Sequence, residues 1–151
     1  MKSLSNAFNL ATAVALAGWC ALFGYPWWPQ SARTIVFTIA VVLLSALYVY
    51  FLIFARHLDE PGTKIHGNFR SLAGVVSLFQ SPRVVLAGWI HYLAFDLMVG
   101  LFIAADGARI GIAHGWLLPI LFLTLMFGPA GLLLYLAVRV AVTSGVWMIA
   151  S

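Results

Sequence analysis

The stretch Trp89-Ile-His-Tyr-Leu-Ala-Phe-Asp96 decides the fold, because it places a histidine and a carboxylic acid inside a segment that is otherwise apolar enough to cross a bilayer. An ionisable side chain at that depth costs a few kcal/mol on insertion scales, so it usually faces the interior of a helix bundle and often marks a functional site. His91 and Asp96 are therefore the first places to look for chemistry.

The composition of the chain indicates an integral membrane protein. Of its 151 residues, 64% are hydrophobic and 8% are charged. A soluble domain of this size carries about 25% charged residues. The length suits a single membrane domain, residues 1–151. A lone cysteine, Cys20, excludes an internal disulfide and a multi-cysteine metal cluster.

Four segments hold the roughly 20 mostly apolar residues that a spanning helix needs. We therefore expect an all-α polytopic membrane four-helix bundle with transmembrane helices at residues 5–24, 33–54, 82–105 and 115–138. The first segment is long enough to be a retained helix rather than a cleaved signal peptide. In the last segment, Pro119 and the pair Gly128-Pro129 indicate either a kink that improves packing or a broken helix beside a polar cavity.

An even number of spans would put both termini and the loop between the second and third helices on one side. The opposite side would hold only two cations, Arg33 and Arg109. The side with the termini would hold six: Lys2, Arg56, Lys64, Arg70, Arg83 and Arg139. The positive-inside rule then predicts cytoplasmic termini. The absence of a transit peptide agrees with the bacterial inner membrane.

The loop at residues 55–81 carries apolar residues at helical spacing: Phe69, Leu72, Val76 and Phe79. This pattern predicts a short amphipathic helix on the membrane surface, or a loop packed under the bundle. The loop also offers metal-ligand side chains: His57, Asp59, Glu60 and His66. Since the clustered histidine motifs of membrane di-iron enzymes are missing from the sequence, we expect no metal and no cofactor.

Asp96 is 13 residues from Arg83 and 10 from Asp106, or roughly 20 and 15 Å along a helix axis, which places it near the bilayer midplane. Tyr92 precedes it by four residues and shares its face. His91 precedes it by five and points about 140° away.

Acid–base chemistry on an apolar substrate is one interpretation of these residues, with Asp96 as proton donor, His91 as base and Tyr92 as the group that orients the substrate. The alternative is that Asp96 only hydrogen-bonds another helix. Trp89, Phe95 and Phe102 could line a groove for a polyene, or be ordinary membrane-core aromatics.

Three sequence strings resemble a known membrane family: Ala87-Gly-Trp-Ile-His-Tyr-Leu-Ala-Phe-Asp96, Asp106-Gly107 and Leu123-Thr-Leu-Met-Phe-Gly-Pro-Ala-Gly131. They are similar to the neoxanthin-synthase-like family, named from the abscisic-acid-deficient protein of plant plastids. The loop strings Leu-Asp-Glu-Pro-Gly-Thr and Gly-Asn-Phe-Arg-Ser resemble its bacterial branch. The resemblance implies conversion of violaxanthin to neoxanthin, an isomerisation that opens an epoxide and needs no redox cofactor, with His91 and Asp96 as the acid–base candidates.

The function that we expect is binding of a carotenoid or another isoprenoid lipid between the helices, with catalysed or assisted acid–base isomerisation of its end ring. The alternative is a non-enzymatic carotenoid-binding or accessory subunit of a larger membrane complex. A proton path through Asp96 is a third interpretation, which would require a homo-oligomer. The sequence offers no basic face for nucleic acid.

Overall fold

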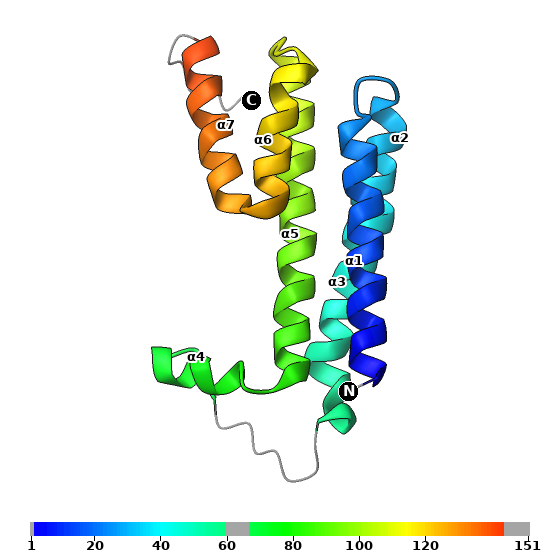
Figure 1. Ribbon diagram of the computed structural model, residues 1–151, viewed down its shortest axis with the longest axis vertical. Helices are drawn as coiled ribbons and strands as arrows, with labels where there is room; N and C mark the ends of the chain where they lie inside the picture. Colours follow the sequence, from blue (N-terminus) through cyan, green and yellow to red (C-terminus); the bar gives the residue numbers. More distant parts are fainter. Residues whose placement is uncertain (1, 60–66, 144–151) are drawn as a thin grey trace.

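The computed structural model describes residues 2–59 and 67–143, and every regular element in these two ranges is helical. Three continuous helical stretches are long and apolar enough to cross a membrane: Lys2–Phe23, Pro29–Leu58 and Pro82–Arg109. The expectation of an all-α membrane fold is therefore confirmed. Helix α5 (Pro82–Arg109) is central, with α1 (Lys2–Phe23) and the second stretch on one side of it and a helical hairpin on the other (Figure 1).

The second stretch changes its winding several times along its length. It runs through α2 (Pro29–Arg33), η1 (Thr34–Val41), α3 (Val42–Val49), η2 (Tyr50–Phe54) and η3 (Ala55–Leu58). Both η1 and η2 are π-helical and η3 is a 3₁₀ turn. A π-helical turn shifts the hydrogen-bonding pattern from i+4 to i+5, and such turns often occur at functional sites.

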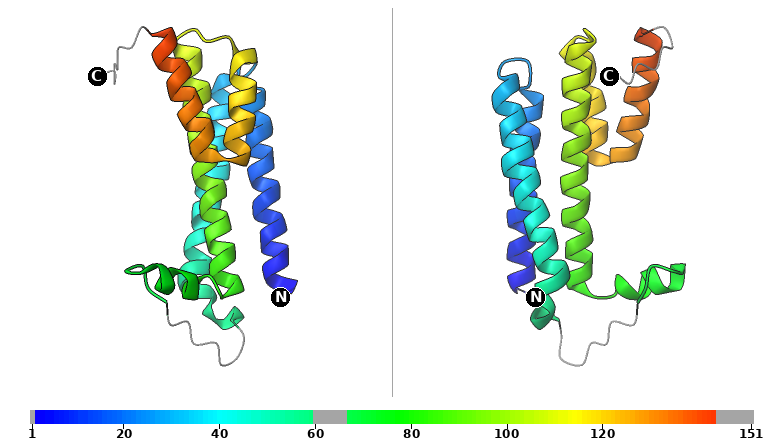
Figure 2. Two further views of the ribbon diagram at one scale, coloured as in Figure 1. Left: turned by 60° about the vertical axis from the view of Figure 1, so that its left-hand side comes forward. Right: turned by 180° about the vertical axis from the view of Figure 1, so that it is seen from behind.

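Helix α4 (Leu72–Leu78) is the short helix expected in the loop, and it projects sideways from the start of α5, away from the bundle (Figures 1 and 2). The Ser71 hydroxyl caps it by accepting a hydrogen bond of 3.1 Å from the Gly74 N–H. Leu72 and Val76 are exposed. Exposed apolar side chains on a helix at the end of a membrane bundle indicate contact with the lipid headgroup boundary.

The fourth predicted span, residues 115–138, was wrong as a single helix. The chain instead forms α6 (His114–Met126) and α7 (Gly128–Val142), which reverse direction at Phe127. At 1.5 Å per residue each helix is roughly 20 Å long, which is shorter than the ~30 Å hydrocarbon core. The two helices run side by side along one half of α5 (Figures 1 and 2). We call residues 114–142 the re-entrant hairpin.

The hairpin also changes the predicted topology. Arg139 contacts Asp106 near the last turn of α5, so α7 ends near the same end of the molecule as Arg109. α1 starts at the opposite end of the molecule, which is also the end where α4 lies (Figure 1). The prediction that both ends of the chain share one side assumed four spans. The described residues instead form three long helical stretches and the hairpin, and the end of α7 lies at the end of the molecule opposite to the start of α1 (Figure 1).

The core is formed where α1, the second stretch and α5 meet. Its largest fully buried side chains include Trp19, Leu44, Ile90 and Leu97. Small residues let the helices approach closely: a Cβ at Gly100 would lie 2.8 Å from the Trp19 ring, and one at Gly18 would lie 2.9 Å from the Leu97 side chain. Small residues at helix interfaces are typical of membrane proteins.

Candidate functional site

The tip of the re-entrant hairpin is formed by a helix break at Phe127, Gly128 and Pro129. Proline has no N–H, so Pro129 cannot donate to the Leu125 carbonyl four residues earlier. The Ala130 N–H donates to the Phe127 carbonyl instead of that of Met126. Two backbone acceptors at the end of α6 thus lose their helical partners, and in a bilayer another protein group must satisfy them.

Tyr92 supplies that group from α5. Its hydroxyl oxygen lies 3.1 Å from the Leu125 carbonyl oxygen and 3.1 Å from that of Met126. A hydroxyl has a single proton, so it donates to one of the two carbonyls at a time. Tyr92 therefore holds the hairpin tip against the middle of α5.

Asp96 lies one turn beyond Tyr92, and its carboxyl group lies against the hairpin tip. A Cβ at Gly128 would overlap this carboxyl group, so only glycine fits at the first residue of α7 without a shift. Asp96 is 7% exposed. Its Oδ2 atom is buried and has no hydrogen-bond partner among the residues that the structure describes.

The depth of Asp96 agrees with the sequence-based estimate. It is 13 residues from Arg83 and 13 from Arg109, near the two ends of α5. The corresponding axial distances are about 20 Å on either side. Asp96 thus occupies the middle of a membrane-spanning helix, with the N-terminal end of α7 directed at its carboxyl group, where the helix dipole favours negative charge.

Trp89 extends this site along the N-terminal half of α5. Its indole N–H donates a 3.2 Å hydrogen bond to the Thr12 hydroxyl of α1. Its ring centroid lies 5.5 Å from that of Phe8 and 5.4 Å from that of Tyr92. Phe8 and Trp89 are partly exposed. The three rings form an aromatic row that leads from the end of α1 to the hairpin tip and can be reached from the lipid.

His91 lies apart from this row, as its spacing from Asp96 indicated. Its ring is stacked on Phe95 at 4.4 Å between centroids and lies 5.4 Å from that of Tyr48 in α3. His91 and Phe95 are both exposed. The structure therefore brings Tyr92, Asp96 and Trp89 together, and places His91 and Phe95 on another face of α5.

Phe102 belongs to neither group. Its ring meets the ring of the buried Tyr135 edge to face at 5.7 Å, nearer the outer end of the hairpin. The three aromatics predicted as one substrate groove thus occupy three separate positions along α5.

A buried ionic cluster that the sequence analysis missed joins the outer end of the hairpin to α5. The Asp106 Oδ2 atom accepts hydrogen bonds from the Tyr135 hydroxyl at 2.5 Å and from the Arg139 Nε at 2.7 Å. The Asp106 Oδ1 atom accepts one of 2.7 Å from Arg109. The signal was available, because Tyr135 and Arg139 are four residues apart and share a helix face.

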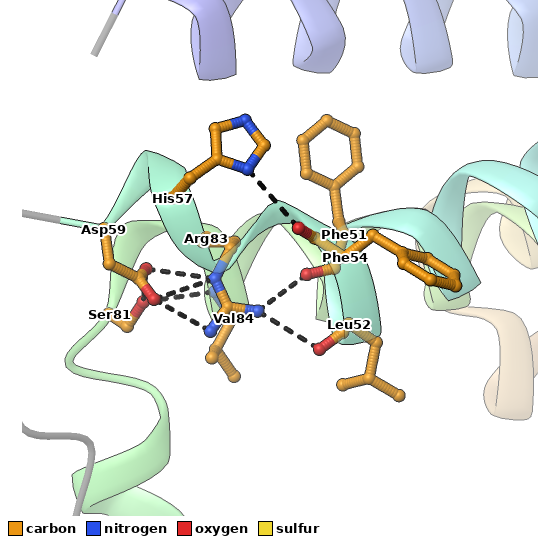
Figure 3. Close-up of polar contacts among 8 residues, drawn as sticks. All are labelled: Phe51, Leu52, Phe54, His57, Asp59, Ser81, Arg83 and Val84. Atoms are coloured by element: carbon orange, nitrogen blue, oxygen red, sulfur yellow. Dashed lines mark hydrogen bonds and ion pairs between the residues drawn. The ribbon is translucent and has the colours of Figure 1, made fainter.

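A second missed cluster closes the opposite end of the molecule (Figure 3). The Arg83 Nε lies 3.0 Å from both carboxylate oxygens of Asp59, and its Nη1 donates to the Phe51 carbonyl at 2.6 Å. Phe51 lies in the π-helical turn η2. The Arg83 guanidinium, together with the Ser81 hydroxyl, holds the pKa of Asp59 below its usual range despite partial burial.

The predicted loop ligands are only partly within the described residues. Asp59 is occupied by Arg83, and His57 Nδ1 lies 3.3 Å from the Phe54 carbonyl (Figure 3). Glu60 and His66 lie outside the described residues. Within residues 2–59 and 67–143, no group of three or more metal-ligating side chains comes together.

These features define a polytopic helical membrane protein with a buried carboxyl group at the tip of a re-entrant hairpin. The family described as ABA DEFICIENT 4-like matches residues 6–135, and the chain belongs to this family. The resemblance to neoxanthin-synthase-like proteins is thereby confirmed, and it links the chain to carotenoid and abscisic-acid metabolism. No curated protein and no solved structure matches the chain.

Proposed function

We propose that the protein binds a carotenoid or a related polyene from the bilayer and catalyses or assists acid–base isomerisation of its end ring at Asp96. The observation that carries this proposal is the buried Asp96 Oδ2, which lacks a partner among the described residues at the middle of the membrane. A buried polar group without a partner costs free energy. Proteins keep such an unpaired group at binding sites, because the bound ligand supplies the missing hydrogen-bond partner.

The aromatic row of Phe8, Trp89 and Tyr92 gives an apolar substrate a path to this carboxyl group. Aromatic rings bury a large apolar area and offer flat faces to a flat conjugated chain. The row is partly exposed at Phe8 and Trp89 and ends at the hairpin tip. A polyene lying along it would bring one end ring to Asp96 without leaving the membrane.

The chemistry that fits one carboxyl group is a proton shuttle. In its protonated form, Asp96 donates a proton to the epoxide oxygen as the carbon–oxygen bond opens. The carboxylate then accepts a proton from the first carbon of the polyene chain, which is attached to the ring carbon whose bond to oxygen has opened, so that the allene forms and the acid is restored. Because the net reaction is an isomerisation, one group that first gives and then takes a proton needs no redox cofactor. Tyr92 positions the carboxyl group and the hairpin tip.

His91 has a different role in this proposal from the one expected from sequence. Its stacking on Phe95 and its contact with Tyr48 place it on another face of α5. We assign it to binding of the polyene or of a partner rather than to proton transfer.

We propose that the protein lies in the inner membrane of a bacterial cell. In the orientation that we propose, the end of the molecule with Lys2 and α4 faces the cytoplasm. Among the described residues, that end carries four cations, Lys2, Arg56, Arg70 and Arg83, and the opposite end carries Arg33, Arg109 and Arg139. Arg83 at the first end is paired with Asp59, and Arg109 and Arg139 at the other end are paired with Asp106. The larger number of lysine and arginine residues thus favours a cytoplasmic N-terminal end.

The first test is the absorption spectrum and pigment content of the protein purified from its native membrane in mild detergent. We expect a carotenoid at near-unit ratio in the wild type, and formation of an isomer of equal mass when an epoxy-carotenoid is supplied. Asp96→Asn should abolish formation of the isomer while the pigment stays bound. His91→Ala serves as the matched control on α5 and should weaken binding but leave conversion by the bound fraction. A folded Asp96→Asn protein that converts pigment normally would refute the proposal.

A second candidate, a non-enzymatic carotenoid-binding or accessory subunit, is favoured by the exposed His91–Phe95 stack. This stack could hold a polyene or a partner helix without any proton transfer. Its signature in the same experiment is pigment bound at near-unit ratio, no isomer from wild type or variant, and pigment loss in His91→Ala.

A further inference from the structure

A second site lies on another face of the molecule, between the second helical stretch and the outer half of α5. Two adjoining cavities open there, of about 460 and about 550 Å³. Ligand sites in proteins typically measure about 300–1,000 Å³. The two cavities share Arg33, Phe102 and Ala105 in their walls, so together they form one continuous groove.

The groove is charged at one end and apolar along the rest. The larger cavity is lined by Arg33 and Arg109, close to the end of α5. The smaller one is lined mainly by apolar side chains, among them Phe37, Met98 and Leu101. Met98 is 11 residues before Arg109, or about 16 Å deeper along the helix axis. That is roughly half of the ~30 Å hydrocarbon core, the depth of a single leaflet.

Both arginines that line this groove end have a defined partner in the protein. The buried Tyr25 hydroxyl accepts a 2.8 Å hydrogen bond from Arg33 Nε, which leaves the two terminal nitrogens of Arg33 for another acceptor. Arg109 shares Asp106 with Arg139, and its side chain is 54% exposed. Arg33, Arg109 and the Asp106 carboxylate line this end and carry a net charge of +1, which attracts an anion.

The π-helical segment Thr34–Val41 forms one wall of the groove. Its wide turns place Thr34, Phe37 and Thr38 along the groove directly after Arg33. A π-helical wall next to a cavity is a second feature typical of ligand sites.

We propose that this groove binds one anionic phospholipid of the leaflet opposite the N-terminus, with its phosphate between Arg33 and Arg109 and an acyl chain along Phe37, Leu101 and Phe102. Arginine pairs with phosphate through two parallel hydrogen bonds, and the apolar wall continues in the direction of the acyl chains. The site is independent of Asp96 and of the pigment.

The test is native mass spectrometry of the full chain in detergent, titrated with phosphatidylglycerol or with phosphatidylcholine. We expect one phosphatidylglycerol to remain bound and phosphatidylcholine to bind at least fivefold more weakly. Each arginine that contacts an anionic lipid headgroup increases the affinity for that lipid. Arg33→Gln and Arg109→Gln should therefore each weaken binding of phosphatidylglycerol about fivefold, and the double variant about 25-fold. Arg70→Gln, at the opposite end, is the matched control and should bind like the wild type.

Further variants keep the test decisive if Arg33→Gln does not fold. Ala105→Phe fills the junction of the two cavities without changing charge and should abolish retention of phosphatidylglycerol, while Arg33→Lys should keep most of it. The proposal is overturned by equal binding of the two lipids, by an equal loss in Arg70→Gln, or by full retention in Ala105→Phe. Complete displacement by inorganic phosphate would also overturn it, because it would show a phosphate site without a lipid.

Discussion

Three carboxylates lie along α5, one near each end and one at its middle, and they differ in their hydrogen-bond and ion-pair partners. Asp106, near one end, accepts hydrogen bonds from Tyr135, Arg139 and Arg109. Asp59, at the other end, is paired with Arg83. Asp96 lies between them, buried, with Oδ2 unpartnered among the described residues.

This difference separates the carboxylates that join elements of the bundle from the one to which we propose a functional role. The end carboxylates hold elements together: Asp106 joins α7 to α5, and Asp59 joins the end of the second stretch to the start of α5. The Asp96 Oδ2 atom has no hydrogen-bond partner in the part of the chain that the structure describes, and the adjacent Gly128 leaves room for the carboxyl group. Burial of a carboxyl group at the middle of a membrane costs free energy. A buried carboxyl group that joins no elements of the fold is therefore a candidate for a functional residue.

The largest expected effect is on Asp106. Asp106→Ala removes the carboxylate that accepts hydrogen bonds from the Tyr135 hydroxyl, Arg139 and Arg109 in this cluster. Breaking a buried ion pair in this way costs about 3 kcal/mol of unfolding free energy. Equilibrium unfolding in mixed micelles of mild detergent and dodecyl sulfate would measure it.

Arg109→Gln is the control, because it removes only the exposed member of the cluster. It should cost less than about 1 kcal/mol. Equal losses in the two variants would contradict the view that the buried pair carries the structural role.

The next effect tests the contact between the hairpin tip and Asp96. Gly128→Ala adds a methyl group that overlaps the Asp96 carboxyl group, and overpacking of this kind costs about 1–3 kcal/mol. Asp96→Ala removes the overlapping atoms, so the double variant should recover most of that loss. The same unfolding assay on the two single variants and the double variant gives the coupling free energy. Additive effects would show that the tip does not meet Asp96.

A smaller effect is expected from pH at the opposite end. Since Arg83 holds the pKa of Asp59 below its ordinary value of 3.8, the carboxylate contributes stability that is present above that value. This stability is lost as the pH falls through the lowered pKa of the folded state. Thermal unfolding between pH 6 and pH 3 should therefore show a steeper loss in the wild type than in Asp59→Asn. Parallel curves would contradict the assignment.

The sequence was sufficient to predict the helices that have a continuous apolar run or a regular helical spacing of apolar residues. The apolar runs predicted the three long spans, and the spacing of Leu72 and Val76 predicted α4. Asp96 could be singled out because a carboxylate inside an apolar run is costly wherever its partners lie. Its angular separation from His91 was also correct, because it follows from helix geometry alone.

The re-entrant hairpin could not be predicted from hydropathy. Residues 115–138 are apolar enough to span, and a count of apolar residues does not distinguish a kink at Gly128-Pro129 from a full reversal. The reversal depends on contacts distant in sequence: Tyr92 with the freed carbonyls of α6, and Asp106 with Arg139. The position of the end of α7, at the end of the molecule opposite to the start of α1, could not be predicted for the same reason.

The most direct test of the central claim is the unfolding free energy of Asp96→Asn, measured beside Asp106→Asn in the same mixed micelles. If Asp96 is held for function, its isosteric amide should change stability by less than about 1 kcal/mol, and the amide at Asp106 should cost clearly more. A loss at Asp96 equal to that at Asp106 would show that Asp96 is a structural carboxylate and would contradict the account.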